Sequence, residues 1–377
     1  MKKLLVFILV LLFSITCFVA CSGNNDSGPD YLTFNISDDG TYAEVATCLP
    51  YTEQAVIPDT YQGLPVKSIG DGAFSDCSFL KSVTVPDSVT SIGDEAFRDC
   101  HSLASVNIPD GVTSIGKNAF KNCNFITSVT IPEGIESISD GAFAGCDSLT
   151  SVTIPDSVTS ISAEAFKRCT SLTSIDIPDS VTSIGDNAFS ECTSLANVNI
   201  PDGVTSISNE LFCDCTSLVS IVIHYGVTSI GNSAFSGCTG LTNVTIPNSV
   251  TSIGAGAFSG CDSLAYYEYD NAYYLGNTAN PYLVLVTAKE ESFSACEVNA
   301  NTKIILGSAF LFKGGLTSVA IPESVTSIGK NAFKRCSLTN IYYGGTTLQW
   351  NEIIKGTDWD YDAGEYTVVC TDGTLSK

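Results

Sequence analysis

The chain has 377 residues, of which 44% are hydrophobic, and its formal net charge at neutral pH is −23. This charge excludes duplex and single-stranded nucleic acid as natural partners, because neutralising phosphates requires clustered lysine and arginine. With two histidines and one methionine, the chain also has little material for catalysis.

Residues 1–20 have the pattern of a secretory signal peptide. Lys2 and Lys3 precede an apolar run from Leu4 to Phe13 that is too short to span a membrane. The segment ends in Phe18-Val19-Ala20-Cys21, which resembles a bacterial lipobox and implies that Cys21 is lipidated as the first mature residue. We therefore expect an exported protein, lipid-anchored at the bacterial cell surface or outer membrane, with simple secretion as the alternative.

Two short segments precede the main body of the chain. Residues 21–30 are small and polar, which is typical of a flexible tether. In residues 31–56, Leu32 to Ile36 alternates apolar and polar residues, and Asp39-Gly40 and Tyr42 to Ala46 follow. This pattern predicts a β-hairpin that caps the N-terminal end of a stack.

A 23-residue unit fills most of the remaining chain. A phenylalanine recurs every 23 residues, and from Cys77 to Cys261 a cysteine follows each phenylalanine after three positions. The phenylalanines are Phe74, Phe97, Phe120, Phe143, Phe166, Phe189, Phe212, Phe235 and Phe258, and the period resumes at Phe310 and Phe333. A fixed period of this length predicts a solenoid in which each unit stacks on the next.

Each unit has a regular internal pattern. Val152 and Ile154 alternate with polar residues, which predicts a strand that ends at Pro155. A second short strand is expected from Val158 to Ile161. The segment that follows, around Phe166, fits one α-helical or 3₁₀ turn with its apolar side inward.

The repeated pattern I-P-x-S-V-T-S-I-G-x-x-A-F-x-x-C-x-S-L-x-S-V resembles the BspA-type leucine-rich repeats of bacterial surface proteins. The resemblance implies a right-handed leucine-rich-repeat-type β-solenoid with short parallel strands, in about twelve coils over residues 57–264 and 293–340. It implies adhesion to, or binding of, host or neighbouring-cell proteins, and it brings no catalytic residues and no cofactor. The alternative is a structural spacer or surface-coat protein without a specific ligand.

One coil, residues 265–292, is irregular. The step from Leu264 to the equivalent Phe293 is 29 residues rather than 23. The coil holds six tyrosines: Tyr266, Tyr267, Tyr269, Tyr273, Tyr274 and Tyr282. By analogy with the regular strand, Tyr267 and Tyr269 should face inward and Tyr266 outward. Since tyrosine is enriched at binding hot spots, the candidate contacts are Tyr266, Tyr273, Tyr274 and Tyr282. The alternative is an aromatic patch that packs the insertion onto the stack.

The outward positions of the regular strands form a second candidate surface. Ser151, Thr153, Ser174 and Asp176 represent this polar stripe. Their hydroxyl and carboxylate groups could bind a protein or a glycan, or they could be β-favouring filler.

Two further sets of equivalent residues, the cysteines and the acidic residues after the strand prolines, are best explained by the structure of the stack. Equivalent cysteines in stacked coils lie about 4.8 Å apart, which is within disulfide range, but nine in a row cannot all pair. We therefore expect buried free thiols. Acidic residues such as Asp156 and Asp179 follow the strand prolines, where aspartate suits a turn; a divalent cation is the alternative, and no metal site is predicted.

Residues 341–377 lack the repeat and are expected to form a C-terminal cap. Leu348, Trp350 and Ile353 suggest a short helix, and Tyr366 to Cys370 a final strand. No motif of an enzyme is present anywhere in the chain, so we predict that the protein is not an enzyme.

Overall fold

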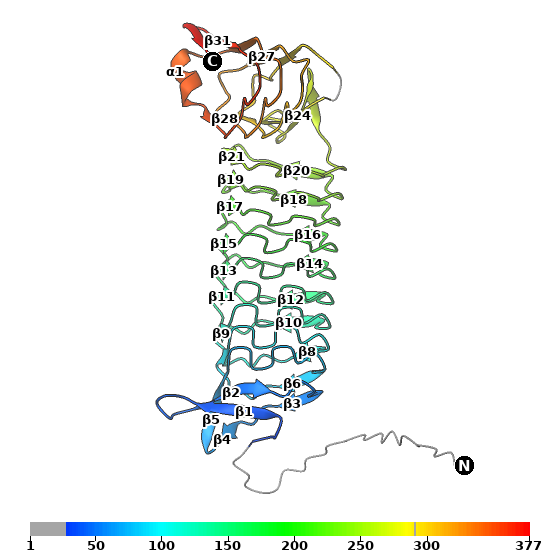
Figure 1. Cartoon of the computed structure of the whole chain (residues 1–377), viewed down its shortest axis with the longest axis vertical. Coiled ribbons are helices and arrows are strands. Elements are labelled where there is room, and N and C mark those ends of the chain that lie inside the picture. Colours follow the sequence, from blue (N-terminus) through cyan, green and yellow to red (C-terminus); the bar gives the residue numbers. More distant parts are fainter. Residues whose placement is uncertain (1–27, 290–291) are drawn as a thin grey trace, which may run out of the picture.

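The computed structural model describes residues 28–289 and 292–377. These residues form a rod of stacked coils, with the N-terminal strands at one end and the C-terminal strands at the other (Figure 1). The predicted signal peptide, Cys21 and most of the predicted tether lie outside the described residues.

The predicted β-solenoid is confirmed. It has about 14 turns of about 23 residues, rather than twelve. The additional turns lie at the ends of the rod, where the coils lack the phenylalanine and cysteine that mark the repeat. One example is β30 (Ile354–Lys355), which pairs in parallel with β28 (Ser327–Ile328) beyond the expected end of the repeats.

Each coil contributes a strand to each of two columns, and paired strands within a column are parallel with equivalent residues opposite each other. In the regular stack the first column comprises β3 (Gln54–Val56), β6 (Ser82–Thr84), β8 (Ser105–Val106), β10 (Ser128–Thr130), β12 (Ser151–Thr153), β14 (Ser174–Ile175), β16 (Asn197–Val198), β18 (Ser220–Val222) and β20 (Asn243–Thr245). The second comprises β2 (Ala43–Cys48), β5 (Leu64–Ile69), β7 (Ser91–Ile92), β9 (Ser114–Ile115), β11 (Ser137–Ile138), β13 (Ser160–Ile161), β15 (Ser183–Ile184), β17 (Ser206–Ile207), β19 (Ser229–Ile230) and β21 (Ser252–Ile253).

The segment after the second strand is a series of turns, not the α-helical or 3₁₀ turn that the sequence suggested. The N–H groups of Glu164, Phe166 and Arg168 donate to carbonyls of the next coil at 2.8–2.9 Å. Glu164 and Arg168 have left-handed backbone angles, with φ of 57° and 60°. Because alternate N–H groups bond to the neighbouring coil, they are not available for the bonds within the coil that a helix needs.

The core is built from columns of equivalent side chains. From Phe74 to Phe258, successive phenylalanine rings stack with centroids 4.8–5.9 Å apart. Phe166 and Cys169 are fully buried. Since each ring is covered by the rings of the two neighbouring coils, a single coil has no core of its own.

The regular stack is interrupted after β20 and β21, which pair with no later strand. The chain then forms the antiparallel strands β22 (Tyr267–Tyr269), β23 (Ala272–Leu275) and β24 (Val284–Ala288). Parallel pairing restarts from β24 through β26 (Ile304–Ile305), β28 and β30, and from β25 (Ala295–Glu297) through β27 (Ser318–Ile321), β29 (Asn340–Tyr343) and β31 (Thr367–Cys370). We call residues 265–377 the distal block and the preceding coils the shaft.

Each end of the rod carries a hairpin. At the N-terminal end, β1 (Leu32–Ile36) pairs antiparallel with β2, and β4 (Thr60–Tyr61) pairs antiparallel with β5. At the C-terminal end, α1 (Thr347–Glu352) precedes the hairpin of β31 and β32 (Gly373–Ser376). Among the residues that the structure describes, no helix has the length and apolar character needed to cross a membrane.

Candidate functional site

The tyrosines of the irregular coil divide between the two faces of the β22–β23 hairpin. On one face, Tyr267, Tyr269, Tyr274 and Tyr282 form an edge-to-face cluster with ring centroids 5.6–6.4 Å apart. Tyr267 is 46% exposed, and Tyr269 and Tyr282 are half-buried. We call Tyr267, Tyr269 and Tyr282 the tyrosine patch.

Tyr274 lies beneath this patch and is fully buried. Its hydroxyl accepts a hydrogen bond from the main-chain N–H of Asn299 at 3.4 Å, and burial raises the pKa of Tyr274. Tyr274 therefore cannot touch a partner, contrary to the expectation from the sequence. The cause is the position of Tyr274 in the middle one of three antiparallel strands, where it pairs with Tyr267 and Leu285 and its side chain joins the core of the distal block.

The opposite face of the hairpin holds the other two tyrosines. Tyr266, expected to point outward, packs against the shaft core, and burial raises the pKa of Tyr266 to about 12. Tyr273 is half-buried beside it, and the ammonium of Lys289 lies 5.9 Å from the Tyr273 ring centroid. Tyr267 was expected inward and is instead exposed, because β22 belongs to a hairpin and does not continue the first column.

The residues predicted for the polar stripe are exposed. Ser151 and Thr153 lie on β12, and Ser174 and Asp176 lie on and just after β14. No hydrogen-bonded pairing joins β12 to β14, so the stripe is not one continuous sheet. Ser174 and Asp176 line a shallow groove along β14, β16 and β18.

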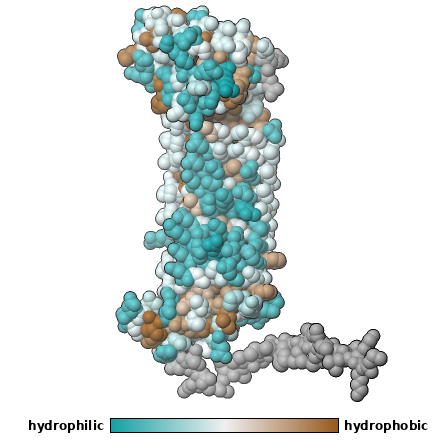
Figure 2. Space-filling view, in the orientation of Figure 1, coloured by the Kyte–Doolittle hydropathy of each residue, from teal (hydrophilic) through white to brown (hydrophobic). Residues whose placement is uncertain are grey.

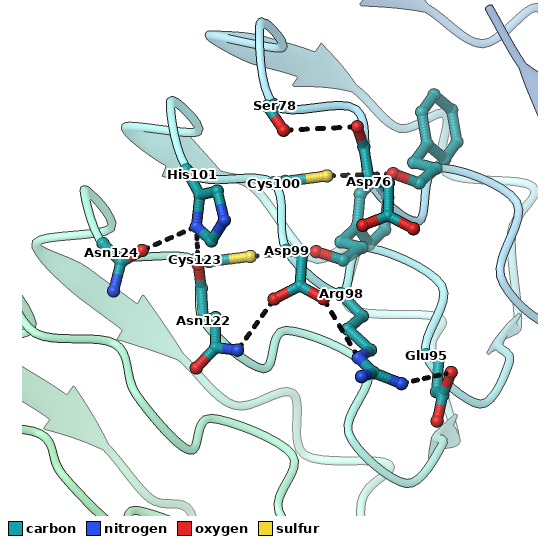
Figure 3. A network of polar contacts seen from close by, with 12 residues as sticks. Asp76, Ser78, Glu95, Arg98, Asp99, Cys100, His101, Asn122, Cys123 and Asn124 are labelled. Carbon is teal, nitrogen blue, oxygen red and sulfur yellow. Dashed lines mark hydrogen bonds and ion pairs between the residues drawn. The ribbon is translucent and has the colours of Figure 1, made fainter. Parts of the chain in front are cut away.

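The cysteines that follow the stacked phenylalanines, from Cys77 to Cys261, are buried free thiols, as predicted. We call them the ladder cysteines. The thiol of Cys100 donates to the main-chain carbonyl of Phe74 at 3.0 Å, and that of Cys123 donates to Phe97 at 3.1 Å (Figure 3). Burial raises the pKa of Cys100 to about 12, so this thiol is protonated at neutral pH. These cysteines are structural, since a reactive cysteine needs an accessible thiolate.

Polar side chains on the turns between coils bind one another (Figure 3). The Asp99 carboxylate accepts a hydrogen bond from the amide of Asn122 at 2.7 Å and one from the Arg98 guanidinium at 3.1 Å. His101 Nδ1 lies 3.0 Å from the main-chain oxygen of Asn122. This network joins adjacent coils and contains no nucleophile paired with a base, so it explains stability rather than catalysis.

A second exposed aromatic group lies in the distal block and was not found from the sequence. Phe312 is 61% exposed, and the Arg335 guanidinium lies 5.3 Å from its ring centroid. Nearby in the sequence, Lys334 lies 5.2 Å from the ring centroid of the exposed Tyr361. Phe312 has φ of 61°, a left-handed conformation that costs a bulky side chain about 1–2 kcal/mol. We call Phe312, Lys334, Arg335 and Tyr361 the aromatic–cationic patch.

The acidic residues after the strand prolines, such as Asp156 and Asp179, are exposed. Across residues 28–289 and 292–377, no group of three or more histidine, cysteine, aspartate or glutamate side chains is arranged to hold a metal ion.

The stacked parallel coils place this protein among the solenoid repeat proteins. The family described as BspA type leucine rich repeat region matches residues 52–173, 159–281 and 287–352, in six copies. The chain therefore belongs to the BspA-type leucine-rich repeat family.

Among the solved structures that are similar to this chain, two are at least 25% identical to it over at least 86% of its length. A leucine rich cell surface protein from Faecalibacterium prausnitzii is 31% identical, with a TM-score of 0.50, over 86% of this chain and 96% of its own. A leucine-rich repeat protein from Bacteroides ovatus is 25% identical, with a TM-score of 0.53, over 91% of this chain and 100% of its own. No match is found among curated proteins.

Proposed function

We propose that this protein is a bacterial adhesin, anchored by a lipid on Cys21, whose distal block binds a protein of a host or neighbouring cell. The N-terminal strands and the distal block lie at opposite ends of the rod (Figure 1). An anchor at Cys21 would therefore attach the end of the rod that lies away from the distal block. The regular shaft coils would act as a spacer, about 4.8 Å per coil.

The tyrosine patch is the observation that carries this proposal. It occurs where the repeat is interrupted, and it presents three amphipathic rings supported by the buried Tyr274. Tyrosine provides a large contact area with a polar tip, which suits a surface that is wet when unoccupied. The aromatic–cationic patch adds a second exposed aromatic surface to the same block.

The charge distribution supports a division between shaft and distal block. Residues 22–264 hold 28 acidic against 7 basic residues, a net −21, whereas residues 265–377 hold 12 against 8, a net −4. On the face shown in Figure 2, hydrophilic residues cover much of the middle of the rod, and hydrophobic residues gather near its ends. A strongly negative shaft disfavours close contact with anionic surfaces, while the distal block carries little net repulsion.

The test is binding of the purified mature protein to immobilised matrix proteins. Tyr267→Ser combined with Tyr269→Ser should reduce saturable binding at least tenfold, because both rings belong to the tyrosine patch. The matched control is Tyr51→Ser, since Tyr51 is 82% exposed at the other end of the rod. Equal losses in both variants would contradict the assignment to the distal block. Absence of saturable binding to any matrix protein would favour the alternative, a spacer without a specific ligand.

A further inference from the structure

Departures from the repeat converge on one groove in the shaft. A groove of about 600 Å³ lies along β14, β16 and β18, a volume within the range of small-ligand sites. Its polar and apolar lining includes Asp176, Asn197, Asn199, Asp202, Val222 and His224. Except for Asp202, each of these replaces the usual residue of the repeat, which is serine, threonine or proline at these positions.

Asn199 makes two hydrogen bonds to the preceding coil. Its side-chain oxygen accepts from the N–H of Ile177 at 3.1 Å, and its amide donates to the carbonyl of Ile177 at 2.7 Å. These bonds hold β16 to the preceding coil, and β16 does not pair with β18. Between the coils that contain β16 and β18, the hydrogen bond from the N–H of Val219 to the carbonyl of Ala196 is long, at 3.5 Å. The amide of Asn199 still has one donor and one acceptor position free for a ligand.

His224 and Tyr225 replace the proline and the aspartate that the repeat has at these positions. His224 Nδ1 accepts a hydrogen bond from the N–H of Gly226 at 3.0 Å, so the proton of the neutral ring is on Nε2. Among the described residues, Nε2 of His224 has no hydrogen-bond partner. The adjacent Tyr225 is 80% exposed and does not line the groove.

The composition of the lining decides the class of ligand. No lysine or arginine lines the groove, so an anion would meet only the carboxylates of Asp176 and Asp202. Those carboxylates are not part of any cluster that could hold a metal ion. The lining offers acceptors, amide donors and an apolar surface at Val222, which is 73% exposed. These groups match an uncharged ligand with many hydroxyls and an apolar C–H face.

We propose that this groove binds a saccharide. The site lies on the shaft, on coils separate from the tyrosine patch, and so it does not depend on the function proposed for the distal block. Aspartate and asparagine side chains would bind the sugar hydroxyls, and Val222 would contact the C–H face of the ring.

The experiment is an array of bacterial and mammalian glycans probed with the full mature protein, followed by saturation-transfer NMR with the sugars that bind. Asn199→Thr, and the double change His224→Pro with Tyr225→Asp, restore the residues of the repeat and should therefore fold. Each should weaken saccharide binding about tenfold or more, because it removes hydrogen-bonding groups from the groove. The matched control is Asn107→Thr, the same substitution at the equivalent position after β8, which should leave binding unchanged.

Failure of every glycan to bind would overturn the proposal. So would an equal loss in the Asn107→Thr control, or full retention of binding in both groove variants. If the groove variants lose binding to a matrix protein while no glycan binds, the groove binds a protein, and the proposal of a saccharide ligand is wrong. The Tyr267→Ser and Tyr269→Ser changes should leave saccharide binding intact, which keeps the two proposals distinguishable.

Discussion

The thiol of Cys192 donates a hydrogen bond to the main-chain carbonyl of Phe166, 3.1 Å away in the preceding coil. The same carbonyl accepts the N–H of Cys169 at 3.2 Å, so one oxygen joins two coils. The contact repeats through the shaft to Cys261, whose thiol donates to Phe235 at 3.1 Å. The cysteine column is thus a series of hydrogen bonds between coils as well as part of the apolar core.

Replacing one ladder cysteine should destabilise the stack. Cys192→Ala removes the hydrogen bond to Phe166 and leaves a small cavity in a fully buried position. We expect the free energy of unfolding to fall by about 1–3 kcal/mol in urea titrations. The matched control is Cys213→Ala, because Cys213 is half-exposed on a turn. A control that loses as much stability as Cys192→Ala would contradict the role assigned to the ladder.

The same thiols make the fold sensitive to alkali. Burial raises the pKa of Cys146 and of Cys192 to about 12, from an ordinary value of 9. Below pH 9 these thiols are protonated in both the folded and the unfolded chain, and their contribution to stability is constant. Between about pH 9 and pH 12 the unfolded chain releases these protons and the folded chain does not, so the free energy of unfolding falls by about 1.4 kcal/mol per pH unit for each thiol.

Thermal melts from pH 7 to pH 11 would measure this loss. Cys192→Ala should reduce the slope of the free energy of unfolding against pH by the contribution of one thiol. A melting temperature that does not change above pH 9 would show that the thiolates are tolerated inside the folded stack.

Phe312 should limit the stability of the distal block. Its left-handed backbone, with φ of 61°, suits asparagine better than phenylalanine or alanine. Phe312→Asn and Phe312→Ala both remove the contact with Arg335. We therefore expect the asparagine variant to exceed the alanine variant by about 1 kcal/mol in free energy of unfolding. Equal stabilities would mean that the strain at this position is relieved in solution.

The tyrosines of the irregular coil should separate into packing and contact residues. Tyr274→Ser empties a fully buried position and should cost about 3–5 kcal/mol, by analogy with other buried aromatic truncations. Tyr267→Ser changes a partly exposed ring and should cost about 1 kcal/mol or less. Chemical denaturation of both variants would test this order, and the reverse order would place Tyr267 in the core.

Membrane attachment should depend on Cys21. Cys21→Ala should move the exported protein from the detergent phase to the aqueous phase in detergent partitioning, because the acyl chains would be absent. Cys17→Ala is the matched control and should partition as the unmodified chain does. If both variants remain in the detergent phase, the anchor is not on Cys21.

The period of the sequence alone was sufficient to predict the fold. When equivalent residues recur every 23 positions, coils stacked in register place Phe166 over Phe189, and their ring centroids are 5.7 Å apart. The alternation in β12 likewise separates exposed Ser151 and Thr153 from the partly buried Val152. These features depend only on local pattern and repetition, which the sequence displays directly.

The orientation of the tyrosines depended on the tertiary structure. The sequence located the six extra residues of the irregular coil, but it did not reveal that they form the antiparallel strands β22, β23 and β24. The pairing of these strands, which no local pattern predicts, decides which tyrosines face the core and which face solvent. The groove has the same origin. Asn199 and His224 are visible as departures in the sequence, but they share a surface only because stacking places their coils side by side.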